Sequence, residues 1–182
     1  LVLDHIINHI AVDDAASYLL FLQDLFPYFE KYGASELCKK VVDRIEYIMN
    51  EHNIAAPCDR ALLLDYKAEL QLQNGQAENA LKKRNRAIKI IEQDYEKSAD
   101  KRNSNLLSNL YNNLSNTYLA LHKEKEAAAS LEKAFLIRMD HAELGLTETH
   151  DLLQQMMNLT NPGLRHLSAY TWYHFPKSVE TV

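Results

Sequence analysis

The chain has 182 residues, of which 47% are hydrophobic and 25% charged, a composition typical of a globular protein with a sizeable core. Its formal net charge of −5 argues against nucleic acid as a direct partner, because phosphate binding requires a basic surface. No apolar run approaches the roughly 20 residues of a membrane span, so no membrane partner is expected.

The spacing of apolar residues predicts an all-α protein, and the segment 1–13 is interpreted as the end of a preceding helix. Turn signals such as KYGAS at 31–35, QNGQ at 73–76 and TNPG at 160–163 separate the helices. The basic run KKRNRAIK at 82–89 is interpreted as the solvent-exposed side of one helix. The expected helices run near 15–31, 35–52, 59–73, 77–97, 100–121, 124–142, 148–160 and 164–175.

Several kinds of position recur along the chain with one spacing. Small side chains recur in the second helix of each expected pair, at Cys38, Ala80, Ala127 and Ala169. Large side chains recur in the first helix, at Leu22, Leu64, Tyr111 and Leu153. Both series have spacings of 42, 47 and 42 residues, and two turn glycines, Gly33 and Gly75, are also 42 residues apart. An internal repeat of this length is typical of stacked helix pairs.

One unit alternates large and small residues in a characteristic order, at Tyr111, Leu114, Ser115, Tyr118, Ala127, Leu131 and Ala134. This order resembles the tetratricopeptide repeat, in which small residues let two antiparallel helices approach and large ones fill the gaps. The resemblance covers about residues 15–176, and the unit length is similar to that of kinesin light chain repeats. It implies a right-handed superhelical solenoid of about four helix pairs, forming a single domain over 1–182.

Several positions depart from the family pattern, among them Phe26, which replaces the small residue of the first repeat. Lys67, Gln71 and Arg84 stand where the family has leucine, tyrosine and phenylalanine.

The helix expected at 100–121 contains six asparagines within NSNLLSNLYNNLSNTY at 103–118. On a helical wheel, leucine and tyrosine gather on one side and five of the asparagines on the other. The resemblance implies that the first helix of each unit lines a concave groove, so these amides would line it together with polar residues of neighbouring units. The predicted peptide-binding residues are Asn105, Asn109, Asn112, Asn113, Asn116, Asp65, Tyr66, Glu69, Gln154 and Asn158.

A primary amide both donates and accepts hydrogen bonds, so a row of asparagines can bind the backbone of an extended peptide. Similar asparagine ladders occur in kinesin light chains and in the superhelix of O-linked N-acetylglucosamine transferase. The carboxylate-clamp members of the family use lysine and arginine in this groove, whereas Asp65, Glu69 and Asp151 here favour a neutral or basic segment. The alternative interpretation is a polar helix face that is merely solvated.

No catalytic residue, metal site or cofactor is predicted, and the chain is not expected to be an enzyme. His5 and His9 have i, i+4 spacing but lack the acidic general base of an H-E-x-x-H motif, so a structural or surface role is expected. Cys38 and Cys58 form no zinc or disulfide pattern, which favours a reducing, cytoplasmic setting.

Two hypotheses for function follow. The first is a protein-interaction module whose concave groove binds a peptide segment. The alternative is a sensor or regulatory domain of a larger signalling or transcription-regulating protein, with the output domain outside this sequence. The start at Leu1, without a methionine, suggests a piece of a longer chain.

The C-terminal segment is rich in aromatic residues, namely Tyr170, Trp172, Tyr173 and Phe175. We expect it to pack on the last unit, and the alternative is an exposed apolar patch for a missing domain or for self-association.

Overall fold

The structure, a computed structural model, describes residue 7 and residues 14–95, 101–141 and 146–160. This part of the chain is all-helical, as predicted, and contains no strand. Each helix boundary lies within two residues of the predicted one, while the helix expected at 164–175 lies outside the described residues. The helices are α2 (Ala15–Lys31), α3 (Ser35–Glu51), α4 (Pro57–Gln73), α5 (Ala77–Tyr95), α6 (Lys101–Ala120), α7 (Glu124–Asp140) and α8 (Leu146–Thr160).

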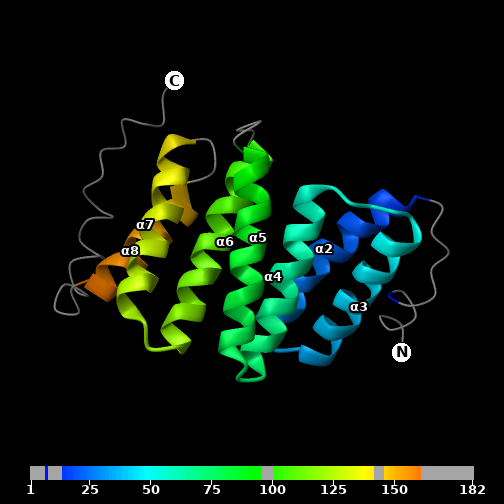
Figure 1. Cartoon of the computed structure of the whole chain (residues 1–182), viewed down its shortest axis with the longest axis horizontal. Helices are drawn as coiled ribbons and strands as arrows, with labels where there is room; N and C mark the ends of the chain where they lie inside the picture. Colours follow the sequence, from blue (N-terminus) through cyan, green and yellow to red (C-terminus); the bar gives the residue numbers. More distant parts are fainter. Residues whose placement is uncertain (1–6, 8–13, 96–100, 142–145, 161–182) are drawn as a thin grey trace.

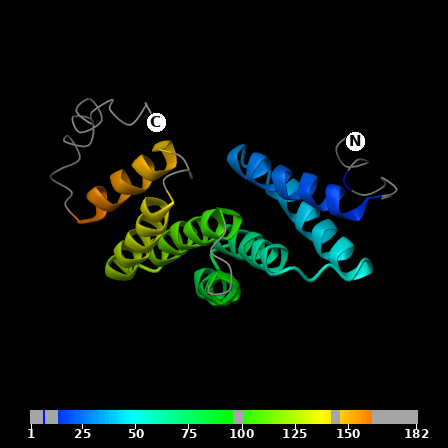
Figure 2. The same ribbon diagram turned by 90° about the horizontal axis from the view of Figure 1, so that it is seen from above.

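Helices that follow one another along the chain also pack against one another (Figure 1). The pairs α4–α5 and α6–α7 share the most extensive contacts, α5 also packs on α6, and the contact between α3 and α4 is small. Seen from above, the helices follow an arc (Figure 2). Helices α2 and α8 lie at opposite ends on the same side of this arc, and α5 lies on the other side of α4 and α6. Within the described ranges, no helix is both long and apolar enough to cross a membrane.

Local sequence accounts for several helix ends. The carboxylate of Asp14 caps α2 by accepting hydrogen bonds from the backbone N–H groups of Ala16 and Ser17, both at 3.1 Å. Pro57 begins α4, where its missing N–H is not needed and its fixed φ suits the first turn. These ends are set by short-range chemistry, so they were accessible to prediction.

The three turns inside the helix pairs share one backbone conformation. Each has a residue with positive φ, namely Gly33 (67°), Gly75 (73°) and His122 (57°). In each turn the N–H of this residue bonds to the carbonyl three residues earlier, and the next N–H bonds to the carbonyl five residues earlier. This is the Schellman arrangement that ends a helix. The three residues are 42 and 47 residues apart, so the turns repeat with the spacing found in the sequence.

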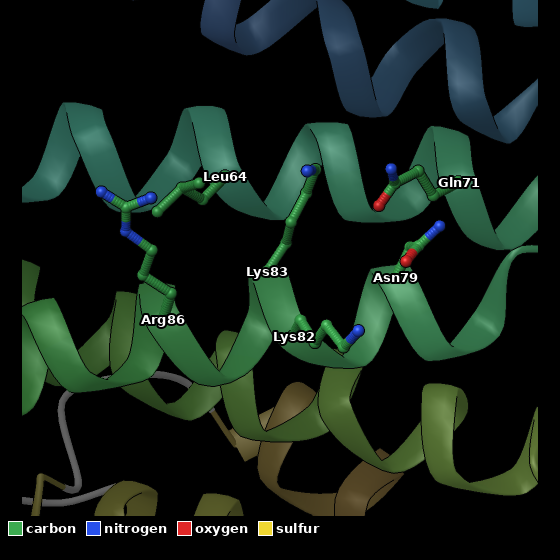
Figure 3. A pocket seen from close by; sticks show the side chains of 6 residues that line it. All are labelled: Leu64, Gln71, Asn79, Lys82, Lys83 and Arg86. Carbon is green, nitrogen blue, oxygen red and sulfur yellow. The ribbon is translucent and has the colours of Figure 1, made fainter.

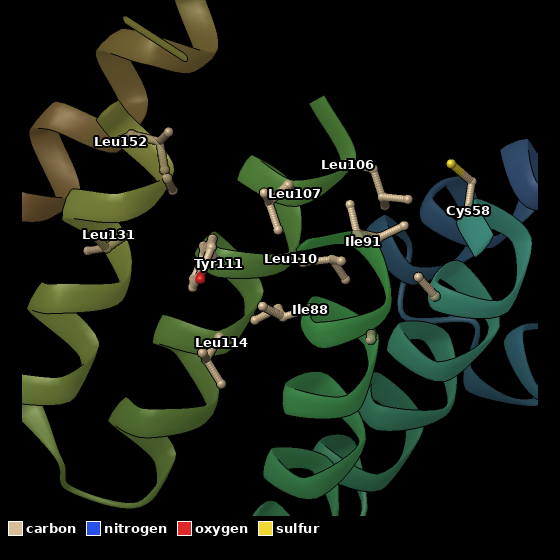
Figure 4. Packing of buried hydrophobic residues seen from close by; sticks show 13 residues of the cluster. Cys58, Ile88, Ile91, Leu106, Leu107, Leu110, Tyr111, Leu114, Leu131 and Leu152 are labelled. Atoms are coloured by element: carbon tan, nitrogen blue, oxygen red, sulfur yellow. The ribbon is translucent and has the colours of Figure 1, made fainter. Parts of the chain in front are cut away.

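Two hydrophobic clusters fill the described part of the molecule. One joins α2 and α3 with partly buried side chains of α4, and the other joins α4 through α8 (Figure 4). In the second cluster, Ile91 of α5 and Leu110 of α6 are fully buried. The small residues of the repeat pattern, Cys38, Ala80 and Ala127, also have no exposed surface. Their burial confirms that they lie where helices approach closely.

The turn at His122 generates the first prediction. For a non-glycine residue the left-handed conformation costs about 1–2 kcal/mol. Glycine removes this cost, but the greater conformational entropy that glycine loses on folding offsets roughly half of the gain. We therefore expect His122→Gly to raise the free energy of unfolding by about 0.5–1 kcal/mol, and Gly75→Ala to lower it by about 1 kcal/mol. Urea denaturation of both variants measures these shifts. Destabilisation by His122→Gly would show that the histidine side chain has a structural role.

Candidate functional site

The most unusual residue in the described structure is Arg84 of α5, whose side chain is fully buried. Its Nε atom donates to Oδ1 of Asp65 at 3.0 Å, and its Nη2 atom donates to Oε2 of Glu69. Both carboxylates belong to α4. The interpretation of the basic run 82–89 as a solvent-exposed face is therefore wrong at Arg84. This arginine points inward because two acidic side chains of the paired helix neutralise it.

The same guanidinium also contacts α6. Its Nη1 atom donates to the carbonyl oxygen of Asn113 at 2.6 Å and to the hydroxyl of Thr117. The side chain of Asn113 closes the network, because its Nδ2 atom donates to Oδ2 of Asp65 at 2.8 Å. We call Arg84, Asp65, Glu69, Asn113 and Thr117 the Arg84 network. It joins three helices and links the α4–α5 pair to the α6–α7 pair.

The Arg84 network changes the role of three predicted groove residues. Asp65 is only 6% exposed and, like Asn113, is held by residues of this chain. Burial raises the pKa of the Asp65 carboxyl, while the Arg84 charge and the Asn113 amide counteract that rise. Glu69 is half-buried and engaged by Arg84. The prediction that Asp65 faces a groove is wrong, because both of its oxygens are occupied inside the protein.

A third carboxylate lies near the network. Glu30 of α2 is exposed, yet its pKa is raised by desolvation and by the negative charges of Glu69 and Asp65. Glu30 of α2 and Asp65 and Glu69 of α4 thus place three carboxylates near one guanidinium, so negative charge is in excess at this place.

Tyr66, another predicted groove residue, joins α4 to α2. Its hydroxyl donates to the carbonyl oxygen of Gln23 at 2.9 Å, and its ring stacks on Phe26 with centroids 4.0 Å apart. Burial raises the pKa of the Tyr66 hydroxyl. The Gln23 side chain extends the same junction by donating to Asp59 at 3.0 Å. Sequence reasoning missed Gln23, although it stands 42 residues before Asp65 and thus at the corresponding helix position.

Two of the asparagines hold a second buried arginine. Arg138 of α7 is 5% exposed, and its Nη2 atom donates to Oδ1 of Asn109 at 2.7 Å and to Oδ1 of Asn105 at 3.2 Å. Asn105 and Asn109 are themselves exposed residues of α6. Arg138 was also missed, although its place four residues after buried Ala134 signals a position on the buried side of the helix.

The remaining asparagines of the prediction have fewer contacts inside the chain. Asn116 is exposed and forms no side-chain hydrogen bond to another residue in the described ranges. Asn112 is half-buried, and its Oδ1 atom is buried with no hydrogen-bond partner among the described residues. On α8, Gln154 is exposed and Asn158 half-buried. They follow Asn112 and Asn116 by 42 residues and so occupy the corresponding positions of the next unit.

Comparison with known proteins gives no family for this chain. No protein-family model matches it, and a search of curated proteins finds no match. The function is therefore argued from the site alone.

The described ranges contain no group of three or more histidine, cysteine or acidic side chains arranged to hold a metal ion. His5, His9 and the aromatic residues of the C-terminal segment lie outside these ranges.

The Arg84 network generates the second prediction. Arg84→Leu leaves two carboxylates without their counter-charge, so we expect a loss of about 3–5 kcal/mol in the free energy of unfolding. Adding Asp65→Asn and Glu69→Gln to Arg84→Leu should recover more than half of this loss, because no charge then remains at the site. Chemical denaturation measures both. Arg86→Leu, an exposed position two residues away, is the control and should stay within about 0.5 kcal/mol. An Arg84→Leu protein as stable as the wild type would contradict the network.

The third prediction separates two asparagines on the same helix. Asn109→Ala removes a hydrogen bond to a buried charge and should lower the free energy of unfolding by about 1.5–3 kcal/mol. Asn116→Ala removes no hydrogen bond to a described residue and should change it by about 0.5 kcal/mol or less. Both positions are exposed and gain the same helix propensity, so each variant controls for the other. Equal effects in urea denaturation would show that the Arg138 contact does not contribute to stability.

Proposed function

We propose that this chain is a protein-interaction module that binds an extended, neutral or basic peptide along the polar face of α6, with further contacts from α4 and α8. The observation that carries the proposal is the state of Asn112 and Asn116. They belong to a helix whose other predicted groove asparagines are engaged within the chain, while Asn116 is exposed and Asn112 has a buried acceptor without a partner among the described residues. A buried acceptor without a hydrogen bond costs about 1–3 kcal/mol, and rotation of the Asn112 side chain toward the surface would let a bound peptide N–H remove this cost.

The geometry of a helix suits this role. Asn112 and Asn116 are one turn apart, so their side chains emerge about 6 Å from each other along the helix axis. Alternate residues of an extended peptide lie about 6.6–6.8 Å apart and point their backbone groups the same way. Two amides spaced by one helical turn can therefore bond to alternate residues of such a peptide, each donating to a C=O and accepting from an N–H.

The proposal includes the finer architecture, a tetratricopeptide-like solenoid with a concave face. Three observations support it. The helices follow an arc, the left-handed turn residues recur after 42 and 47 residues, and the small residues with the same spacing are buried between helices. In such a solenoid Gln154 and Asn158 would extend the row begun by Asn112 and Asn116 onto the next helix.

Charge supports the choice of partner. Glu69 lies on α4, which packs against α6, and the pKa of Glu30 on α2 is raised by desolvation and by the negative charges of Glu69 and Asp65. A basic peptide would relieve the repulsion among these carboxylates and a neutral one would not add to it, whereas an acidic peptide would increase it. The module acts by binding in this proposal, and it needs no cofactor.

The fourth prediction tests this site. A peptide selected from a displayed random library against the wild type should bind the Asn112→Ala, Asn116→Ala double variant about tenfold or more weakly, because each amide contributes hydrogen bonds of about 0.5–1.5 kcal/mol. Isothermal titration calorimetry measures both affinities. The matched control is the Asn50→Ala, Gln93→Ala variant, which removes two exposed amides from α3 and α5. Equal affinity of the double variant and the wild type would contradict the proposal, as would equal weakening by the control.

A further inference from the structure

Two surface hollows occupy corresponding places on neighbouring helix pairs. The first, of about 410 Å³, is formed by α4 and α5 and lined by Leu64, Gln71, Asn79, Lys82, Lys83 and Arg86 (Figure 3). The second, of about 380 Å³, lies over α6 between α5 and α7, and its lining includes Tyr111, Tyr118, Glu126, Ala129, Ser130 and Lys133. Each of these six residues stands 47 positions after its counterpart in the first hollow. The presence of a hollow at this place therefore follows from the way the helices pack.

The positive charge of the first hollow, in contrast, comes from the particular residues that line it. Its lining contains three cationic side chains and no acidic one. At the corresponding positions of the second hollow only Lys133 is basic, and Glu126 and Glu92 add negative charge there. Packing of the helix pairs thus does not require a basic lining.

The three cations are not neutralised within the described part of the protein. Lys82, Lys83 and Arg86 form no ion pair with another described residue, and the nearby carboxylate of Glu46 is taken by Lys67 at 2.5 Å. Lys82 and Arg86 have i, i+4 spacing, and like charges at this spacing destabilise a helix. Figure 3 shows the side chains of Lys83 and Arg86 of α5 extending toward α4, with their charged ends spaced along the two helices.

Gln71 adds a polar group to the α4 side of the hollow. Oε1 of Gln71 is buried and has no hydrogen-bond partner among the described residues. Rotation of the terminal amide by 180° exchanges its oxygen for an NH₂ group, which donates hydrogen bonds to an anion. Asn79 supplies a second amide at the rim. Ammonium, guanidinium and amide donors therefore surround one recess.

We propose that this hollow binds a compact polyanion, a small molecule that carries two or more phosphate groups. Its volume lies within the roughly 300–1,000 Å³ of ordinary small-molecule sites. A guanidinium with two ammonium groups matches the several oxygens and charges of linked phosphates better than those of a single carboxylate. None of these residues belongs to the proposed peptide-binding row, so this site and that function stand independently.

The fifth prediction uses inorganic tripolyphosphate as the probe, with titration calorimetry on the full chain. We expect saturable binding of one tripolyphosphate per chain that weakens as salt is raised from about 0.05 to 0.15 M. The Lys82→Gln, Arg86→Gln variant should weaken binding about tenfold or more. The Lys89→Gln, Lys125→Gln variant changes the net charge equally at exposed positions outside the hollow and should stay within about twofold. Gln71→Glu, which places a carboxylate in the hollow, should also weaken binding at least tenfold, and circular dichroism verifies that each variant is folded.

Three results would overturn this assignment. The first is absence of saturable tripolyphosphate binding by the wild type. The second is equal weakening by the Lys89→Gln, Lys125→Gln control, which would indicate attraction to overall charge only. The third is tighter binding of a glutamate-rich peptide than of tripolyphosphate, with the same sensitivity to Lys82→Gln, Arg86→Gln, which would make the hollow a docking site for acidic protein segments.

Discussion

The structure depends on one buried guanidinium. Transfer of a charged arginine from water into the protein interior costs several kcal/mol, and only well-placed partners offset that cost. Arg84 meets this requirement with two carboxylates of α4 and with oxygen atoms of α6. A shift of α6 along α5 by one turn would deprive Nη1 of its oxygens, so the ion pair restricts how the second and third helix pairs can be aligned. An apolar side chain at position 84 would need no specific partner atoms, so it would allow α6 several positions along α5.

The same requirement explains the abundance of asparagine in α6. Four of its asparagines form hydrogen bonds within the chain, and each bond reaches another helix or a charged group. Asn103, for example, donates to Asp94 of α5 and accepts from the thiol of Cys58 in α4. Amides suit such junctions because one side chain can donate to a carboxylate and accept from an arginine or a thiol. Most asparagines of α6 therefore join helices within the chain, and among the described residues Asn116 forms no such side-chain hydrogen bond and Oδ1 of Asn112 has no partner.

The helices could be predicted from the sequence, because their ends and apolar stripes depend on neighbouring residues. The turn at His122 was harder to predict, because histidine, unlike glycine, does not indicate a left-handed backbone conformation. Its distance of 47 residues from Gly75 nevertheless locates this turn. The partners of Arg84 and Arg138 could not be predicted in this way. They lie between 15 and 33 residues away, and a charged residue gives no sign in a hydropathy pattern that it is buried. The departures from the family pattern at Lys67 and Arg84 were the available signal, since a charge at an apolar position requires a counter-charge.

Lys67 and Arg84 are the two charged residues at positions where the repeat pattern has apolar ones, and they affect the packing of neighbouring helix pairs differently. Arg84 draws its partners from α4 and α6 and strengthens the junction between the second and third pairs. Lys67 pairs with Glu46 of α3, at positions whose counterparts one unit later, Leu114 and Ile88, are apolar and buried. The junction between the first two pairs therefore has a partly exposed ion pair where the next junction has a hydrophobic contact, and an ion pair that water still reaches contributes little to stability. This difference accounts for the small contact between α3 and α4 and for the separation of the hydrophobic residues into two clusters.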